Sequence, residues 1–237
     1  MAFKRAKAPA LVPNANALTA AMAGIGMRFA AKPNRDANIE DTLLFASKEG
    51  MDHDDLRVLA VLVTWFGVHH ERVNADRLTG LVAEQSERVR VFWSAMAKWQ
   101  GKDRRLARLA SAHSGPRLNL LRTGTEFQLE RRGEDPRFVD GPLRVPDGVL
   151  RDRPEDVLSP AELVRKHPGY RCRVQMGVSL RADCWAVLEH DATLTAAELA
   201  RRAYAPFATA WHVKRDFAVV GTASSTWRNS HEDPQVE

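Results

Sequence analysis

The sequence predicts a mainly α-helical fold, because apolar residues recur at helical spacing, because Ser, Thr, Asp and Asn stand at expected helix starts, and because β patterning is confined to one short stretch. Of its 237 residues, 44% are hydrophobic and 27% charged, which excludes wholesale disorder. The longest apolar run, 58–68, is shorter than the roughly 20 residues that cross a bilayer. With no signal-peptide pattern and two cysteines outside any C-x-x-C pair, we expect a cytoplasmic protein with reduced thiols.

The N-terminal half predicts an arm followed by a helical domain. Residues 1–38 are Ala-rich, contain three prolines and lack good caps, so we expect a loosely ordered arm. Residues 39–115 form the predicted helical domain, in which Asp52 caps a helix that Gly67 stops or bends. Asn74 and Ser86 start two further helices, the second with an aromatic stripe that is typical of a core.

The middle of the chain predicts a connector. Residues 116–157 are rich in Gly, Pro, Asp and Arg, and Thr123-Gly124 lies between two short apolar segments, as in a β-hairpin. A third domain is expected over residues 158–237. It opens with Ser159-Pro160-Ala161-Glu162, a capping box that predicts a helix ending near Lys166.

The segment 179–221 predicts three consecutive helices. The first covers 181–189, and the second starts at the capping box Thr195-Ala196-Ala197-Glu198. Tyr204-Ala205-Pro206 forms a turn that lacks the usual glycine, and a third helix runs from about Phe207 to Ala218 and is closed by Gly221. The small residues Ala200 and Ala210 would let the last two helices cross closely.

This order of helices is typical of a helix-turn-helix domain. A polar tail follows it, and the sequence does not decide whether this tail forms a wing. We expect the protein to bind double-stranded DNA as a transcriptional repressor, with its third helix in the major groove. The formal net charge of +5, with basic residues gathered in 165–215, agrees with such a partner. The candidates for base-edge contacts are Thr209, Trp211, His212 and Arg215, and those for phosphate contacts are Arg181, Arg201, Arg202 and Lys214.

Three short segments add a family resemblance. Residues 173–178, the helix start Arg181-Ala182-Asp183 and the helix 196–202 together resemble bacterial helix-turn-helix regulators of the AbiEi-like kind, which are associated with type IV toxin–antitoxin systems. The resemblance covers about residues 170–220. It implies a repressor that also acts as antitoxin, with a nucleotidyltransferase toxin as its protein partner.

Enzymatic alternatives have less support. His69-His70-Glu71 is the densest group of metal-capable side chains, but adjacent histidines seldom converge on one ion, and the other ligands that zinc needs are missing from the pattern. Phosphate-binding loops and nucleophile elbows are also missing from the sequence. We therefore expect neither an enzyme nor a metal or other cofactor.

Two functional hypotheses remain open. In the first, the helical N-terminal domain supplies a homodimer contact, and two helix-turn-helix units bind two half-sites. In the second, the protein is a protein-binding adaptor or antitoxin that neutralises a partner enzyme without contacting DNA.

Overall fold

The structure is a computed structural model that describes residues 12–229, with side chains described through residue 220. It is mainly α-helical, as predicted, with twelve α-helices and one two-stranded sheet in this part of the chain. The chain divides into an N-terminal unit that ends at Arg171 and a C-terminal unit that begins at Cys172. The division falls inside one helix, whereas the sequence predicted a domain start at residue 158.

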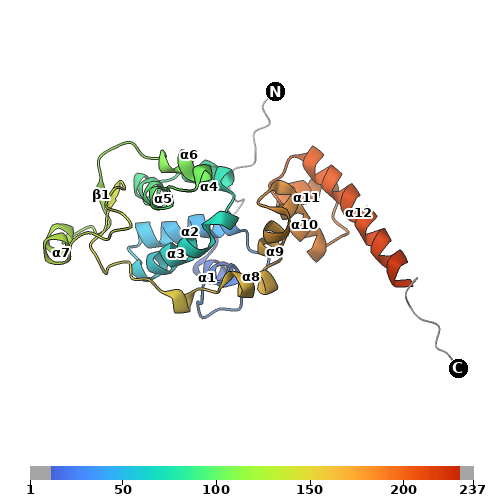
Figure 1. Cartoon of the computed structure of the whole chain (residues 1–237), viewed down its shortest axis with the longest axis horizontal. Coiled ribbons are helices and arrows are strands. Elements are labelled where there is room, and N and C mark those ends of the chain that lie inside the picture. Colours follow the sequence, from blue (N-terminus) through green and yellow to red (C-terminus); the bar gives the residue numbers. More distant parts are fainter. Residues whose placement is uncertain (1–11, 230–237) are drawn as a thin grey trace. The chain divides into compact units, whose positions relative to one another are not determined.

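The elements of the N-terminal unit include short 3-10 helices, written η (Figure 1). They are α1 (Ala15–Gly24), α2 (Ile39–Asp52), α3 (Leu56–His69), η1 (His70–Arg72), α4 (Ala75–Val82), α5 (Glu87–Trp99), η2 (Arg104–Leu106), α6 (Ala107–Ala110), β1 (Leu118–Asn119), α7 (Thr125–Arg132), β2 (Leu143–Arg144), η3 (Pro154–Asp156) and α8 (Pro160–Lys166). Helix α9 (Pro168–Met176) crosses the division, and the C-terminal unit continues with α10 (Leu180–His190), α11 (Ala196–Arg202) and α12 (Phe207–Asn229).

Helix α2 is the centre of the N-terminal unit. It contacts α1, α3, α4 and α5, and α2 and α3 lie side by side in the middle of the unit (Figure 1). The predicted aromatic stripe of α5 is core, because Phe92 and Trp93 are fully buried. The Trp93 indole donates to the Ser47 hydroxyl of α2 over 2.9 Å, so even the polar atom of this side chain is paired.

The expected loose arm is wrong for the described residues 12–38. Asn14 accepts a hydrogen bond from the Ala17 amide over 2.8 Å and so caps α1. Leu18 is buried in the core of the unit, and the Trp65 indole of α3 donates to the Ile25 carbonyl over 2.7 Å. Pairing with a distant helix therefore orders this segment. The first part of the predicted arm, 1–11, lies outside the described residues.

Two helix boundaries also differ from prediction in this unit. Asp55 caps α3, whereas Asp52 is the last residue of α2. Gly67 does not stop α3, which continues to His69. A Cβ atom at Gly67 would lie 2.8 Å from Cη2 of Trp99, so the glycine makes room for the indole of α5.

The predicted hairpin near Thr123-Gly124 is wrong. The segment after Gly124 is helix α7, and β1 pairs in parallel with β2, with Leu118 opposite Leu143. Gly124 has φ 74°, a left-handed conformation at the start of α7. The partner strand lies more than twenty residues along the chain, so a local turn signal could not identify it.

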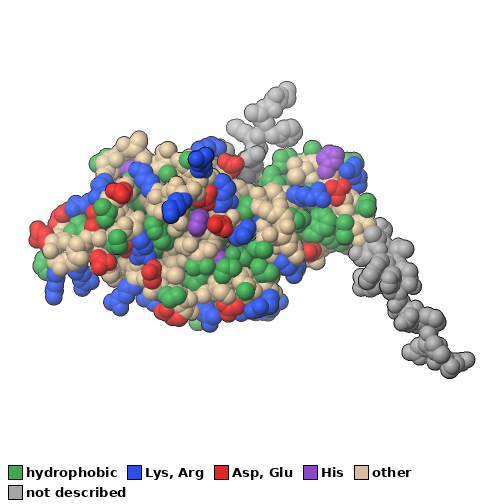
Figure 2. All heavy atoms as spheres, in the orientation of Figure 1, with side chains coloured by type: hydrophobic (Ala, Val, Ile, Leu, Met, Phe, Trp, Pro, Cys, Tyr) green, Lys and Arg blue, Asp and Glu red, His purple; other side chains and the backbone are tan. Residues whose placement is uncertain are grey.

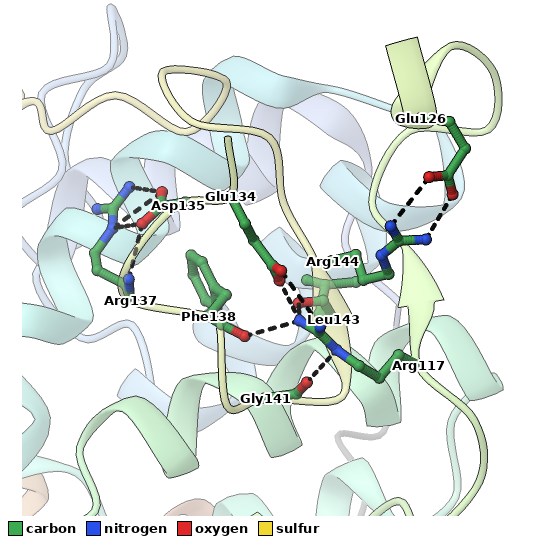
Figure 3. Close-up of polar contacts among 9 residues, drawn as sticks. All are labelled: Arg117, Glu126, Glu134, Asp135, Arg137, Phe138, Gly141, Leu143 and Arg144. Carbon is green, nitrogen blue, oxygen red and sulfur yellow. Dashed lines mark hydrogen bonds and ion pairs between the residues drawn. The ribbon is translucent and has the colours of Figure 1, made fainter. Parts of the chain in front are cut away.

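Arginine side chains order the Gly- and Pro-rich segment 116–157 (Figure 3). The guanidinium of Arg117 donates to the carbonyl oxygens of Gly141 over 2.8 Å and of Phe138 over 3.2 Å, and it pairs with Glu134. A second guanidinium, that of Arg137, donates to the buried carboxylate of Asp135 over 2.6 Å. Backbone carbonyls outside regular structure thus receive donors from side chains. The segment is an integral part of the N-terminal unit.

The capping box at the start of α8 is confirmed, and α8 ends at Lys166 as predicted.

His69 joins α3 to the segment around α8 and α9. The Tyr170 hydroxyl and His69 Nδ1 are 2.9 Å apart, and Nε2 lies 3.0 Å from the Leu158 carbonyl oxygen. Because a carbonyl can only accept, Nε2 carries the proton and Nδ1 accepts from the tyrosine. Burial lowers the pKa of His69 to about 4.

We expect the stability of the protein to fall as the pH drops from about 6.5 to 4. Across this range the unfolded chain protonates His69, whereas the folded chain keeps it neutral, so acid favours unfolding. The slope should approach about 1 kcal/mol per pH unit in urea denaturation. His69→Gln should be less stable at pH 7 but show a flatter pH dependence. Equal slopes in the two proteins would contradict this role.

Arg117→Ala should lower the free energy of unfolding by about 2 kcal/mol, because several carbonyl oxygens and one carboxylate lose a charged donor. The matched control is Arg131→Ala. Arg131 is exposed and makes no hydrogen bond or ion pair within the described residues, so its loss should cost less than about 0.5 kcal/mol. Urea denaturation measures both values. An Arg117 variant as stable as the control would show that the network does not order this segment.

Candidate nucleic-acid interface

The C-terminal unit is built on helices α10, α11 and α12, which pack against one another in the predicted order. Trp185 and Phe217 meet edge to face beside their common core, with ring centroids 5.0 Å apart. The small residues Ala200 and Ala210 lie against or within that core, as predicted for a close crossing. The buried residues of the core are Cys184, Leu188, Leu199, Ala203, Ala210 and Val213.

Helix α11 is fixed at its start by the predicted capping box. The Glu198 amide donates to the Thr195 hydroxyl oxygen over 3.2 Å, and the Thr195 amide donates to the Glu198 carboxylate over 2.9 Å. The hydroxyl and amide of Thr195 hold the pKa of Glu198 below its usual range. A helix of only seven residues therefore has a well-defined first turn.

The turn between α11 and α12 depends on Tyr204. Its φ of 52° is in the left-handed region, a conformation that glycine usually takes, and this turn contains no glycine. The Ala205 amide then donates back to the Ala200 carbonyl over 2.9 Å. Pro206 follows and precedes the first residue of α12, where a missing N–H does no harm. The tyrosine thus takes the position that glycine usually fills.

Helix α12 has an inner and an outer face. Ala210 and Val213 face the core, while Phe207 and Trp211 lie outside it with 55% and 48% of their surface exposed. The side chain of Arg215 is 59% exposed. Its guanidinium lies 5.5 Å from the centroid of the Trp211 ring. On the side of α12 away from the core, the exposed side chains are Phe207, Trp211, His212 and Arg215, and these four residues are called the outer face below.

Helix α12 is longer than predicted. It continues past Gly221 to Asn229, so Gly221 does not close it, and 23 residues correspond to about 34 Å. Figure 1 shows this helix running beyond α10 and α11. The first residues of the predicted polar tail are therefore helical and form no wing. The remainder of that tail, 230–237, lies outside the described residues.

Most predicted cations of the C-terminal unit already have a partner within it. Arg181 and Arg215 both donate to Asp216, over 2.8 and 3.2 Å, and together they hold the pKa of Asp216 below its usual range. Arg202 lies 4.0 Å from Asp191. Arg201 is exposed and makes no hydrogen bond or ion pair with any described residue. All four of these arginines, Arg181, Arg201, Arg202 and Arg215, are exposed, so their guanidiniums lie at the surface of the unit.

Two of the residues predicted to contact DNA, Lys214 and Thr209, are less accessible than the others. The Lys214 ammonium donates to the Leu194 carbonyl and is partly buried, so it ties α12 to the loop before α11. Thr209 is half-buried. Sequence reasoning missed one residue, Asp216, which places a carboxylate beside Arg215. Its position directly after Arg215 in the chain was the available signal.

The other candidate chemistries find little support in the described residues. Both ring nitrogens of His69 are hydrogen-bonded, so neither is available to a metal. No group of three His, Cys, Asp or Glu side chains among residues 12–220 could hold a metal ion. Both cysteines are buried, and burial raises the pKa of Cys184 to about 12, which makes it a poor nucleophile.

The surface of the N-terminal unit is mixed in charge. Figure 2 shows basic and acidic side chains interspersed on the visible face. An open recess of about 420 Å³ includes Lys102 and Arg105, but Arg105 is already bound to Asp103 and to two backbone carbonyls. The Arg105 guanidinium is therefore not free to bind an anionic ligand in this recess.

Within the described part of the chain, every helix is too short or too polar to cross a bilayer. The chain matches no protein-family model, no curated protein and no solved structure.

Proposed function

We propose that the C-terminal unit is a helix-turn-helix domain that binds double-stranded DNA and represses transcription in the cytoplasm. The observation that carries the proposal is the outer face of α12, which is exposed on the side opposite the core of its unit. A major groove about 12 Å wide admits one such helix. The short, capped α11 before a tight turn is the usual arrangement for presenting it.

The side chains of this unit divide into two roles. His212 and Arg215 can hydrogen-bond to base edges, Trp211 can make apolar contact with them, and Thr209 reaches the groove margin. Arg201 and Arg202 of α11, with Arg181 at the start of α10, are placed for phosphates, which position a protein without reading sequence. Lys214 is left out, because its ammonium is bound to the Leu194 carbonyl. The proposal needs no cofactor.

The N-terminal unit would provide the contacts that a single helix-turn-helix lacks. One such unit seldom binds tightly, so we propose a homodimer on two half-sites. The AbiEi-like resemblance of residues 170–220 further suggests a toxin as protein partner of the N-terminal unit.

A second candidate function is a protein-binding adaptor or antitoxin that never contacts DNA. The exposed Phe207 and Trp211 favour it, because large apolar side chains on a surface often mark protein interfaces. Gel shifts with the promoter of its own gene, run beside affinity capture, separate the two functions. A stoichiometric protein partner together with negative gel shifts would favour the adaptor.

Arg215→Ala should weaken binding to the preferred DNA sequence by roughly 1–3 kcal/mol, whereas Arg201→Ala should weaken binding to all sequences alike and reduce the salt slope by about one unit. The first removes a group that would reach base edges, and the second removes a phosphate contact. Fluorescence anisotropy at several salt concentrations measures both effects, with Arg131→Ala of the N-terminal unit as the control. Unchanged binding in both variants would remove these assignments.

Asp216→Asn should tighten DNA binding by about fivefold, because it removes a carboxylate beside Arg181 and Arg215 from a face that would approach phosphates. The salt slope should become steeper by at most about one unit. Glu130→Gln, an exposed charge removal in α7, controls for the change in net charge. If the two variants bind DNA equally well, the Asp216 side of α12 is not near the phosphates.

A further inference from the structure

We infer that α12 reads thymine in double-stranded DNA, with Phe207 and Trp211 contacting the 5-methyl groups in the major groove. This inference rests on the proposed function and names the bases that the site would select. Two large apolar side chains lead the outer face of a helix of 23 residues, which DNA binding alone does not explain.

Phe207 and Trp211 lie one helical turn apart, so they form one continuous apolar strip. Both are about half exposed, and neither belongs to the core of the C-terminal unit. The strip occupies the first two turns of α12, next to the turn at Tyr204. These are the turns that a recognition helix places deepest in the groove, because its N-terminal residues contact the base edges.

The thymine methyl is the one apolar group that the four bases present in the major groove. Hydrogen-bonding side chains on the outer face come later along α12, at His212 and Arg215. An apolar strip that precedes two polar groups therefore matches a site in which thymine methyls lie beside a hydrogen-bonded base pair.

The surroundings of Trp211 favour methyl contact over stacking on an unpaired base. The guanidinium of Arg215 lies over the ring at 5.5 Å, and the His212 ring meets it at 80° with centroids 5.0 Å apart. A base could stack on the face under the guanidinium only by displacing it. A methyl group needs only a small apolar contact, which the exposed half of the ring can provide.

Charge favours a duplex over a second copy of this chain on the same strip. A parallel two-fold contact centred on Trp211 would bring the Arg215 side chains of both copies together, and like charges in an interface are unfavourable. An antiparallel contact would instead desolvate each Arg215 guanidinium against Phe207 of the other copy, which is also unfavourable. A duplex instead offers phosphates to Arg201 and Arg202 and base-edge acceptors to Arg215, which are all exposed. The strip and its cations are thus complementary to DNA.

The test uses the full chain and a pool of duplexes with 20 randomised base pairs. Sequencing of the bound fraction should show enriched A·T pairs, and the most enriched duplex is then made with thymine or with uracil, which differs only by the methyl group. The wild-type chain should bind the thymine duplex about fourfold more tightly for each methyl contact, the ratio expected for one buried methyl group. Trp211→Ala or Phe207→Ala should bring the ratio towards one. Phe127→Ala, in which a similarly exposed aromatic of the N-terminal unit is removed, should leave the ratio unchanged.

Each other outcome overturns a defined claim. Equal binding of thymine and uracil duplexes by the wild-type chain overturns methyl reading but leaves DNA binding intact. A thymine preference that persists in both aromatic variants overturns the assignment of the two residues. Failure to bind any duplex defeats the proposed function itself. A change of oligomeric state in Trp211→Ala, seen by light scattering without DNA, assigns the strip to contact between copies instead.

Discussion

The left-handed conformation of Tyr204 is the constraint on which the candidate interface depends. It closes the turn between α11 and α12 within four residues, and the Ala205 amide locks that turn to the Ala200 carbonyl. The buried Ala210 and Val213 then fix which face of α12 remains outside. The outer face is therefore a consequence of the turn and the core together.

The N-terminal unit is ordered by a different means. Its segment 116–157 has too little regular structure to satisfy its backbone, and guanidiniums such as that of Arg117 supply the missing donors (Figure 3). The same segment also contributes buried apolar residues, among them Phe138 and Leu150, to the core of the unit. A stretch whose composition resembles a linker is thus part of the core of the unit.

Local signals in the sequence predicted several helix starts, because a cap involves residues three positions apart, but the caps at Asn14 and Asp55 were missed. The capping boxes at Ser159 and Thr195 and the cap at Asn74 are all present. Features decided by distant contacts were missed. Gly67 lies within α3 and leaves room for Trp99, and the segment before Ile39 is joined to α3 by the hydrogen bond from Trp65 to the Ile25 carbonyl. Of the candidate interface, the three helices and their outer residues could be predicted, whereas the partners of the cations could not.

Those partners change what the basic composition of residues 165–215 means. Arg173 is buried against Asp183 at 2.7 Å, and Lys214 is committed to a backbone carbonyl. Arg181 and Arg215 share Asp216. Exposed ion pairs of this kind are weak, so their guanidiniums can exchange a carboxylate for an acceptor on a ligand at little cost, whereas the buried Arg173 cannot. The excess of positive charge counted along the sequence is consequently larger than the charge the unit can offer to a ligand. The proposed interface would therefore draw its selectivity from the shape of α12 and from its apolar and hydrogen-bonding groups more than from charge.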